Sequence, residues 1–575
     1  MKKKQVSTSN VGFTLIKAAP AKGYFHARRQ QQINLDALID ENGKDDPLMY
    51  QIYSLLKPHL PIDKFSRLVP DSLHANHGIA SLQILSLIAA ALQQAAGDLV
   101  MEHASVSVNG TSEDGKKIVR MTLPTLLPRL GIETVRWILN FKDKCQKSMP
   151  DSSDKHIIAS EVESAIKSLN SYSLKGYNPI NFVRWAYEHQ IPYLLLPGHL
   201  IQYGYGKGSR RFMSSFSDET SLIGSNIARN KMTSNNLLKM AGLPVAEQVH
   251  VLDLAMAKLK AAEMGYPVVI KPASLDNGRG VYPGIFSEKD LGHCFDLVLE
   301  HSKSVILEKH IPGDSFRVEV TKGNIIAIRQ RIYPVVTGDG KKTIEMLVAE
   351  LNDSDQRSDS DFSALKTIAV NSELIYFLQL TGRSLSTVPA NGETVRLTRT
   401  SNWSQGGSSV PFTEDIHPDN VELCIEAAEV IGLDIAGIDL ITDDITKSWK
   451  ETEAVICEVN AQPQLVEVIL DHYCTERAPV VITVDNDSSK TSSSEGFMAQ
   501  AIKRSTELVS GRITVSDLRE NGFPLAYIDA LVLSENITRH PDLMGVLDIA
   551  VAHGVPDILA SNTHPLRNMR LSPSV

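Results

Sequence analysis

The sequence predicts a multidomain protein of mixed α/β and α+β class, with a small α/β domain first and a short, mainly helical tail last. The chain has 575 residues, enough for three or four domains at roughly 150 residues each. Its hydrophobic fraction of 42% and charged fraction of 22% are those of an ordinary globular protein. In its middle third, helical periodicity alternates with short apolar runs bounded by turns, which is typical of layered folds.

We expect three regions, at residues 1–170, 171–480 and 481–575. In the first, apolar residues at helical spacing predict a buried helix over 79–97 and another over 132–141. The turn-rich run 147–154 is expected to be a surface loop.

The middle region alternates between the two kinds of element. We expect helices over 230–241 and 251–264, and strands over 266–271 and 304–309. The polar run 352–362 predicts a loop, and the serine-rich run 485–496 predicts a linker or exposed loop.

The charge and the cysteine content limit which classes of function and which cellular compartment we expect. The 58 basic and 67 acidic residues give a net charge of −9, which argues against general nucleic-acid binding. The five cysteines form no Cys-x-x-Cys pair, as expected for free thiols in a reducing compartment. The apolar run 11–16 is too short for a signal peptide, and polar residues interrupt 79–97 too often for a membrane span. We therefore expect a cytoplasmic protein with no membrane partner.

The strongest chemical signal is a pair of apolar strands over 435–442 and 454–460, joined by a polar segment that predicts a hairpin. Strand alternation places Glu458 and Asn460 on one face, and a suitable register would bring Asp439 beside them. Two carboxylates and an amide oxygen suit Mg²⁺ carrying a nucleotide phosphate. The alternative is that both acids simply face solvent.

Two further signals concern phosphate and nucleotide. Lys271 ends an apolar run and is followed by the glycine-rich segment 276–281, whose backbone N–H groups could approach a phosphate closely. Alone, such a segment is more often an ordinary turn. The run 305–318 is an apolar strand followed by polar groups that could line a base and ribose, or merely form a charged strand end.

Six short motifs occur along the chain: Gln202-Tyr-Gly-Tyr-Gly206, Thr337-Gly-Asp-Gly340, Ser404-Gln-Gly-Gly407, Asp415-Ile-His-Pro418, Gly437-Ile-Asp439 and Glu458-Val-Asn460. Their order resembles that found in cyanophycin synthetases, which are ATP-grasp ligases. The chain resembles this family over nearly its whole length, most specifically over 200–465. It is also similar to the ATP-grasp domain of bifunctional glutathione synthetases. The resemblance implies an ATP-grasp fold in 171–480.

The resemblance also assigns roles. ATP would be held by Lys231, Lys271, Asn277, Gly278, Gly280, Val281, Glu308, Lys309, Ile311 and Asp314. Two Mg²⁺ ions, or Mn²⁺ in their place, would be bound by Asp439, Glu458 and Asn460. The catalytic candidates near the acyl phosphate or acceptor are Arg317, Arg331 and Arg399. The acceptor substrate would contact Asn402, Gly406 and Gly407.

Three departures from the family matter. The His-x-x-Glu-His spacing of many amino-terminal domains is replaced here by Gln83, Ser86 and Leu87, so no metal site is expected there. The arginine expected four residues before Asn402 is Thr398, with Arg399 beside it. Either Arg399 reaches the site through a bulge, or the substrate chemistry has changed. Gln405 and Gln464 also replace family residues.

The third departure is the Mur-ligase-like half that follows in the family. Its phosphate loop corresponds to 481–491, where Lys490 and Thr491 persist but both glycines are gone. About 85 residues follow, so we expect a remnant of that half, or else an unrelated helical tail.

The sequence therefore predicts an ADP-forming carboxylate–amine ligase acting on an amino acid or short peptide, and not a complete cyanophycin polymerase. The alternatives are a γ-glutamyl or glutathione-type ligase, and a non-catalytic ATP-binding partner of a complete synthetase. The resemblance further implies a homo-oligomer, a dimer or a tetramer.

Overall fold

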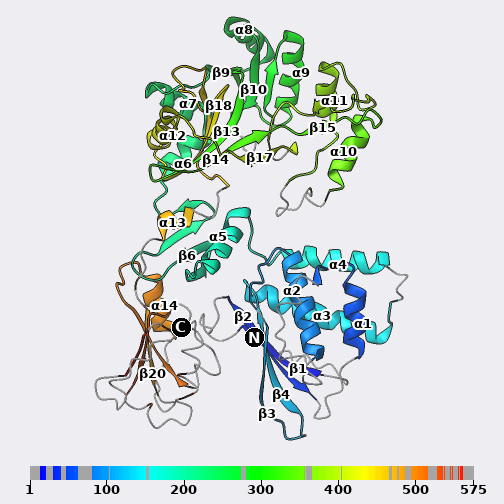
Figure 1. Ribbon diagram of the computed structural model, residues 1–575, viewed down its shortest axis with the longest axis vertical. Helices are drawn as coiled ribbons and strands as arrows, with labels where there is room; N and C mark the ends of the chain where they lie inside the picture. Colours follow the sequence, from blue (N-terminus) through cyan, green and yellow to red (C-terminus); the bar gives the residue numbers. More distant parts are fainter. Residues whose placement is uncertain are drawn as a thin grey trace. The chain divides into compact units, whose positions relative to one another are not determined.

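The structure is a computed structural model of the whole chain (Figure 1). It describes residues 13–20, 30–39, 47–62, 80–102, 104–150, 155–273, 280–354, 357, 365–402, 405–464, 469–474, 478, 480–485, 494–515, 528–534, 537, 544, 547, 555 and 557–560. The chain forms two compact units, one made of Met1–Arg211 with Tyr473–Val575 and the other of Phe212–His472. Strand β7 (Arg210–Met213) and helix α13 (Ile469–Tyr473) contain the points where the chain passes from one unit to the other.

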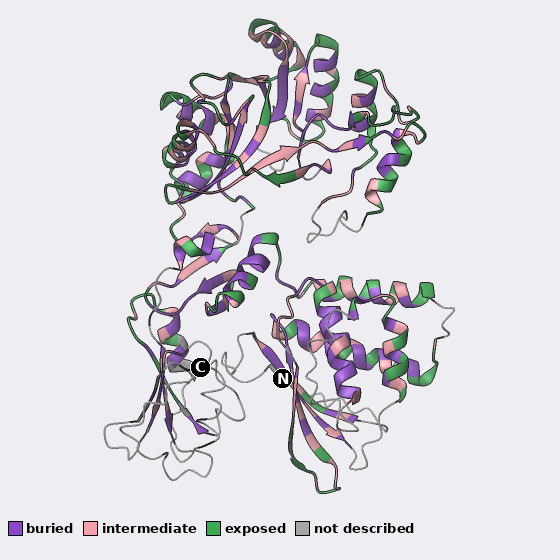
Figure 2. Cartoon of the chain, in the orientation of Figure 1, coloured by how far each residue is buried: buried purple, intermediate pink, exposed green. Residues whose placement is uncertain are grey.

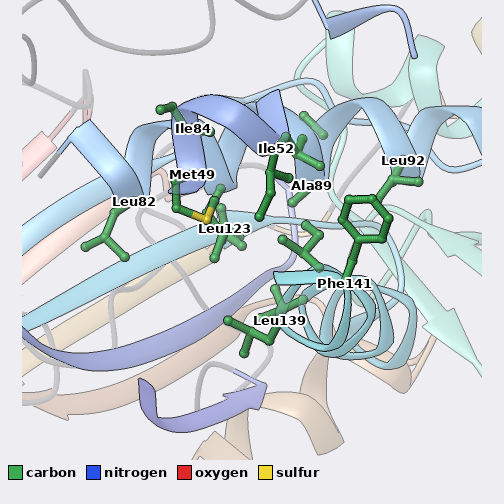
Figure 3. Packing of buried hydrophobic residues seen from close by; sticks show 14 of the residues in the cluster. Met49, Ile52, Leu82, Ile84, Ala89, Leu92, Leu123, Leu139 and Phe141 are labelled. Atoms are coloured by element: carbon green, nitrogen blue, oxygen red, sulfur yellow. The ribbon is translucent and has the colours of Figure 1, made fainter. Parts of the chain in front are cut away.

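The first unit begins with an antiparallel sheet in the order β1-β2-β4-β3, packed against helices. The strands are β1 (Phe13–Pro20), β2 (Gln32–Ile39), β3 (Ser105–Thr111) and β4 (Lys117–Pro124). The helices are α1 (Pro47–Leu56), α2 (Ala80–Ala95), α3 (Pro128–Lys147) and α4 (Lys155–Asn170). Their apolar faces form one core with the sheet, part of which is shown in Figure 3.

Helix α2 confirms the buried helix predicted over 79–97 (Figure 2). It contacts α1, α3, α4 and β4, so nearly all of its circumference is covered. Two of its buried polar side chains bond main-chain carbonyls: Ser86 Oγ donates to that of Gln83 within the helix, and Gln93 Nε2 donates to that of Pro124 at the end of β4. A helix apolar all round is expected in a core.

The end of the chain differs from the mainly helical tail we predicted. Its described residues form a parallel sheet in the order β21-β20-β22-β23, with one helix of nine residues, α14 (Ser494–Ile502). The strands are β20 (Val480–Asp485), β21 (Val509–Thr514), β22 (Ala530–Leu533) and β23 (Asp557–Ala560). Their short apolar runs are typical of parallel strands, but periodicity alone does not separate such runs from buried helix. Lys490 and Thr491 lie outside the described residues.

The Gln202–Gly206 motif joins this sheet to the rest of the first unit. It follows α5 (Tyr177–Glu188) and the hairpin β5 (Tyr193–Leu196)–β6 (Leu200–Tyr203). Gln202 Nε2 and the Gly206 N–H both donate to the carbonyl of Ala501, at 2.8 and 2.9 Å. Carbonyls in the last turn of a helix have no partner within the helix, so the motif caps α14.

Gly206 is the tightest point of this contact. Its φ is +55°, and a Cβ built there would lie 2.6 Å from the carbonyl oxygen of Thr506. Gly198, in the same unit, has a φ of +78° but open space around the Cβ position.

We expect Gly206→Ala to lower the free energy of unfolding of the first unit by about 3 kcal/mol, combining the cost of overpacking with that of a left-handed backbone. Gly198→Ala should cost only the backbone part, about 1 kcal/mol. Urea titration followed by hydrogen exchange of peptides from this unit measures both. Equal losses in the two variants would show that the contact with Thr506 is not tight.

The second unit contains three layers of strands. The largest is a five-stranded sheet in the order β17-β14-β13-β18-β19. These strands are β13 (Asp314–Thr321), β14 (Asn324–Ile332), β17 (Ser408–Pro411), β18 (Ile435–Thr442) and β19 (Val455–Asn460). One face packs against α6 (Leu222–Arg229), α7 (Lys231–Met240) and α12 (Pro418–Ile431). Strand β8 (Phe216–Ser217) pairs with the end of β7.

A four-stranded antiparallel sheet in the order β11-β10-β12-β9 forms the second layer. Its strands are β9 (Gln248–Val251), β10 (Val268–Pro272), β11 (Tyr282–Ile285) and β12 (Val305–Lys309), and α8 (Leu254–Met264) and α9 (Glu288–Leu299) cover one face (Figure 1). The third layer pairs β15 (Val335–Thr337) with β16 (Thr394–Arg396), beside α10 (Ile344–Asn352) and α11 (Ser372–Leu380).

The predicted elements of this unit are confirmed with small shifts. The helix expected over 230–241 is α7, and the one expected over 251–264 begins three residues later because β9 extends to Val251. The two strands expected near Lys271 and Glu308 are β10 and β12. The predicted hairpin is the antiparallel pair β18–β19.

Candidate active site

The hairpin β18–β19 brings the three predicted metal ligands together. Asp439 lies directly opposite Glu458, and Gly437 lies opposite Asn460. Asn460 Nδ2 is 3.3 Å from Asp439 Oδ2. Ile438 and Leu440 point into the helix-covered core, so Asp439 between them faces the other side of the sheet.

A β-bulge makes this register work. Asp439 pairs with Glu458 but Leu440 pairs with Ile456, which leaves Cys457 as the extra residue. Without the bulge, Ile456 and Glu458 would share a face. With it, Ile456 is buried in the core while Glu458 stands beside Asp439.

Two arginines from neighbouring strands hold the carboxylate of Asp439. Arg317 Nε and Nη2 bond its two oxygens at 2.7 and 3.1 Å, and Arg331 Nη2 bonds Oδ1 at 3.0 Å. Burial by itself would raise the pKa of Asp439, but the two guanidinium groups outweigh burial and lower it. Asp439 is therefore a carboxylate throughout the physiological pH range.

Gly437 leaves the room that this ion pair needs. A Cβ at that position would lie 2.4 Å from Arg317 Nη1 and 2.9 Å from Pro463 Cβ. A glycine in a strand interior often marks such a close approach.

Two lysines complete the charged cluster. Lys231, the first residue of α7 after its Asn230 cap, forms an ion pair with Glu458. Lys271 forms one with Glu308 on the face of the four-stranded sheet opposite its helices. Burial lowers the pKa of Lys271, but the Glu308 carboxylate more than compensates and the pKa is raised, so the ammonium stays charged.

Cys457, the bulged residue, is influenced by charged groups of both sheets. Burial raises the pKa of its thiol to about 12, and charges of Lys271 and Glu308 from one sheet and of Glu458 and Asp439 from the other also act on it. Cys457 therefore stays a neutral thiol.

The donor set fits a magnesium nucleotide. Within the described ranges, no three His, Cys, Asp or Glu side chains converge as a complete metal cage. Two carboxylates and an amide oxygen instead match Mg²⁺, which keeps ligand positions for water and phosphate. The Nε atom of Arg331 is buried and has no hydrogen-bond partner in this part of the chain, as expected for a donor that awaits an anion.

The other described residues expected to bind ATP lie in or next to β11, β12 and β13. Lys309 Nζ donates to the carbonyls of Met264 and Gly265, and the exposed Asp314 accepts from Gln330 Nε2. Ile311 is half-buried after β12. Gly280 is buried and Val281 half-buried before β11, whereas Asn277 and Gly278 lie outside the described residues. Their roles stay predictions.

The predicted acceptor residues form a tight loop. The carbonyl of Asn402 accepts from the N–H groups of Gln405 and Gly407, both at 3.0 Å. Gly406 has a φ of +86°, and its carbonyl accepts from Arg357 Nη1 at 2.9 Å. A Cβ on Gly407 would lie 2.3 Å from the carbonyl oxygen of Ser401, so the loop requires glycine there.

Arg399 is not brought to this cluster. Its guanidinium bonds Asp290 at 2.7 and 2.9 Å and the carbonyls of Pro283 and Gly284. These contacts favour a structural role over the predicted catalytic one. Asp290, Cys457 and the steric role of Gly437 were not identified from the sequence. Of these three, only Gly437 has a recognisable sequence signal, which is a glycine inside an apolar strand.

Comparisons with known proteins find relatives of this chain. Residues 384–475 match the RimK-like ATP-grasp domain family. Over 305 residues the chain is 36% identical to cyanophycin synthetase of Geminocystis herdmanii (strain PCC 6308), covering 52% of this chain and 35% of that protein. Over 337 residues it is 26% identical to the glutathione biosynthesis bifunctional protein GshAB of Clostridium perfringens (strain 13 / Type A), covering 56% and 43%.

A solved structure of a bifunctional glutathione synthetase from Pasteurella multocida aligns at 16% identity and a TM-score of 0.40, covering 76% of this chain and 78% of that one. The chain matches only about a third of the length of the cyanophycin synthetases, 35% and 37% for two of them.

By sequence, the chain is related to the ATP-grasp ligases. Within that class its relatives include the cyanophycin synthetases, which confirms the resemblance carried by the six motifs. The described residues contain no helix long and apolar enough to cross a bilayer.

We expect Gly437→Ala to displace Arg317 from Asp439, because the new methyl group would occupy the space of Nη1. Overpacking of this kind costs about 1–3 kcal/mol in the free energy of unfolding, measured by urea titration of the second unit. Gly292→Ala, in open space inside helix α9, is the control and should not destabilise; replacing a helical glycine should instead raise the free energy of unfolding by about 0.5–1 kcal/mol. A stability equal to that of the wild type would show that Arg317 relocates without cost.

Proposed function

We propose that the protein is an ATP-dependent, ADP-forming carboxylate–amine ligase that acts on an amino acid or short peptide. The observation that carries this proposal is the Asp439–Glu458 pair on adjacent strands, surrounded by two arginines and two lysines. The RimK-like match and the relatives named as synthetases support it.

The proposed reaction has two steps. A substrate carboxylate oxygen attacks the γ-phosphorus of ATP, which releases ADP and leaves an acyl phosphate. The amine of the second substrate attacks the acyl carbon, phosphate leaves, and the amine proton passes to solvent or phosphate. Both steps move negative charge, so catalysis depends on fixed cations.

The charged residues of this site would have distinct roles. Lys231 and Lys271 would donate to phosphate oxygens, while Arg317 and Arg331 hold Asp439 and offer the buried Nε of Arg331 to an anion. Asp439, Glu458 and Asn460 would bind Mg²⁺, two ions in our prediction, with Mn²⁺ as a substitute. When bound, the metal would neutralise charge on the transferring phosphoryl group.

A γ-glutamyl or glutathione-type ligase is the second candidate, favoured by the similarity to the GshAB protein. The non-catalytic ATP-binding partner is less well supported, because a protein freed from catalysis would have no evident need for a charged cluster on apolar strands. The cytoplasmic location and the homo-oligomer, dimer or tetramer, stay predictions.

Glu458→Gln should lower substrate-dependent phosphate release by about 100-fold or more, because it removes one metal-binding carboxylate and the partner of Lys231. The assay contains ATP, Mg²⁺ and a panel of amino acids and dipeptides, with products identified by mass spectrometry.

The exposed Glu453→Gln, in the turn before β19, is the matched control and should retain activity. Full activity in Glu458→Gln would contradict the proposal. Nucleotide binding without turnover on the whole panel would favour the non-catalytic partner, and a γ-glutamyl product would favour the second candidate.

A further inference from the structure

Arg399 and Asp290 form the most deeply buried arginine–carboxylate pair described in the second unit. Their side chains are only 5% and 7% exposed, and Nη2 of Arg399 lies 2.7 and 2.9 Å from the two carboxylate oxygens of Asp290. Taking two charges out of water is costly, and the cost is offset only when the geometry is good and the remaining donors are satisfied. Such a pair in the interior therefore needs an explanation.

The other arm of the guanidinium is also occupied. Arg399 Nη1 donates to the carbonyls of Pro283 and Gly284 at 3.1 and 3.0 Å, both in strand β11. An arginine recognises a phosphate through N–H groups that are free to donate to it, most often those of its terminal nitrogens. Here both terminal nitrogens are bound by protein atoms.

Asp290 is itself a meeting point of three elements. It lies on α9, accepts from the hydroxyl of Tyr376 on α11 at 3.1 Å, and receives Arg399 from the connection between β16 and β17. The four-stranded sheet and the layer of α10 and α11 are thus joined at one carboxylate.

The backbone of Arg399 leads directly into the predicted acceptor loop. Residues 398–401 are all buried, and Ser401 and Asn402 form the floor on which Gly407 rests. In the other direction, the guanidinium holds β11, which follows the segment 276–281 predicted to bind phosphate. The side chain of Arg399 therefore connects two places in the chain. One is the start of the loop predicted to bind the acceptor, and the other is strand β11, which follows the segment predicted to bind phosphate.

We propose that Arg399 is a positioning residue: its ion pair with Asp290 and its hydrogen bonds to Pro283 and Gly284 fix residues 398–402 to α9 and β11. The side chain thereby sets the spacing between the two segments that adjoin the predicted substrate-binding residues. This rests on the proposed function for the identity of the segments, though not for the physical connection.

Hydrogen exchange of the intact chain without substrates tests the connection directly. Arg399→Met and Asp290→Asn should each raise exchange in peptides covering 282–286 and 397–402 together, by about tenfold or more, because each variant breaks the same joint. Arg383→Met is the matched control: its ion pair with Glu393 lies in the same unit but is about one-third exposed. That variant should leave both peptides unchanged.

Steady-state kinetics distinguish a positioning role of Arg399 from a catalytic one. Both variants should raise KM for the acceptor and for ATP by about tenfold with a smaller change in kcat, and the double variant should be no worse than either single one. Arg399→Lys, which keeps the charge but loses the fork, should be intermediate. The proposal is overturned if Arg399→Met loses kcat by about 1000-fold while Asp290→Asn behaves as wild type.

The hydrogen-exchange experiment uses neither ATP nor acceptor, so its result stands even if the proposed ligase function is wrong. If the variants at 290 and 399 do not fold, Tyr376→Phe removes only one hydrogen bond to Asp290 and should raise exchange in the same two peptides, by about two- to fivefold. If any of these variants raised hydrogen exchange in only one of the two peptides, the proposed connection between them would be refuted.

Discussion

The buried carboxylate of Asp439, bound by two guanidinium groups, is the interaction on which the second unit depends. Asp439 occupies a central strand, and its partners come from the two strands beyond it on one side. Leaving either a carboxylate or an arginine unpaired at this depth would cost about 3–5 kcal/mol. The register of β13, β14 and β18 and the glycine at 437 follow from keeping this pair together.

The same interaction organises charge on the sheet face. The site holds four cations, Lys231, Lys271, Arg317 and Arg331, against three carboxylates, Glu308, Asp439 and Glu458. The protein's own side chains therefore satisfy most of the charge, with a small positive excess. A phosphate ligand entering this face would exchange contacts with groups already in place, which lowers the reorganisation needed for binding. The cluster is stable as a folded structure and still receptive to an anion.

Much of this was readable from the sequence. The apolar strands with Asp439 and Glu458 at their centres predicted the hairpin, and the helices and strands around Lys231 and Lys271 followed from periodicity. Three features were not. The bulge at Cys457 depends on pairing between two strands, so it has no local sequence signal. The ion pair of Arg399 depends on Asp290, which is far away in the sequence, so it has none either. The carboxyl-terminal sheet was mistaken for helix because its strands are short apolar runs, which periodicity alone does not separate from helix.

The path of the chain has a consequence for biosynthesis. Residues 212–472 are inserted into the first unit, and one of its cores combines Leu194 and Tyr205 with residues such as Val480, Ile482 and Phe497 from beyond the insertion. On the ribosome, the inserted unit is complete and able to fold before the strands that cover Leu194 and Tyr205 have been made. These side chains stay uncovered until translation of the last hundred or so residues. Nascent chains stalled just after the insertion would therefore be the stage at which a chaperone is most needed.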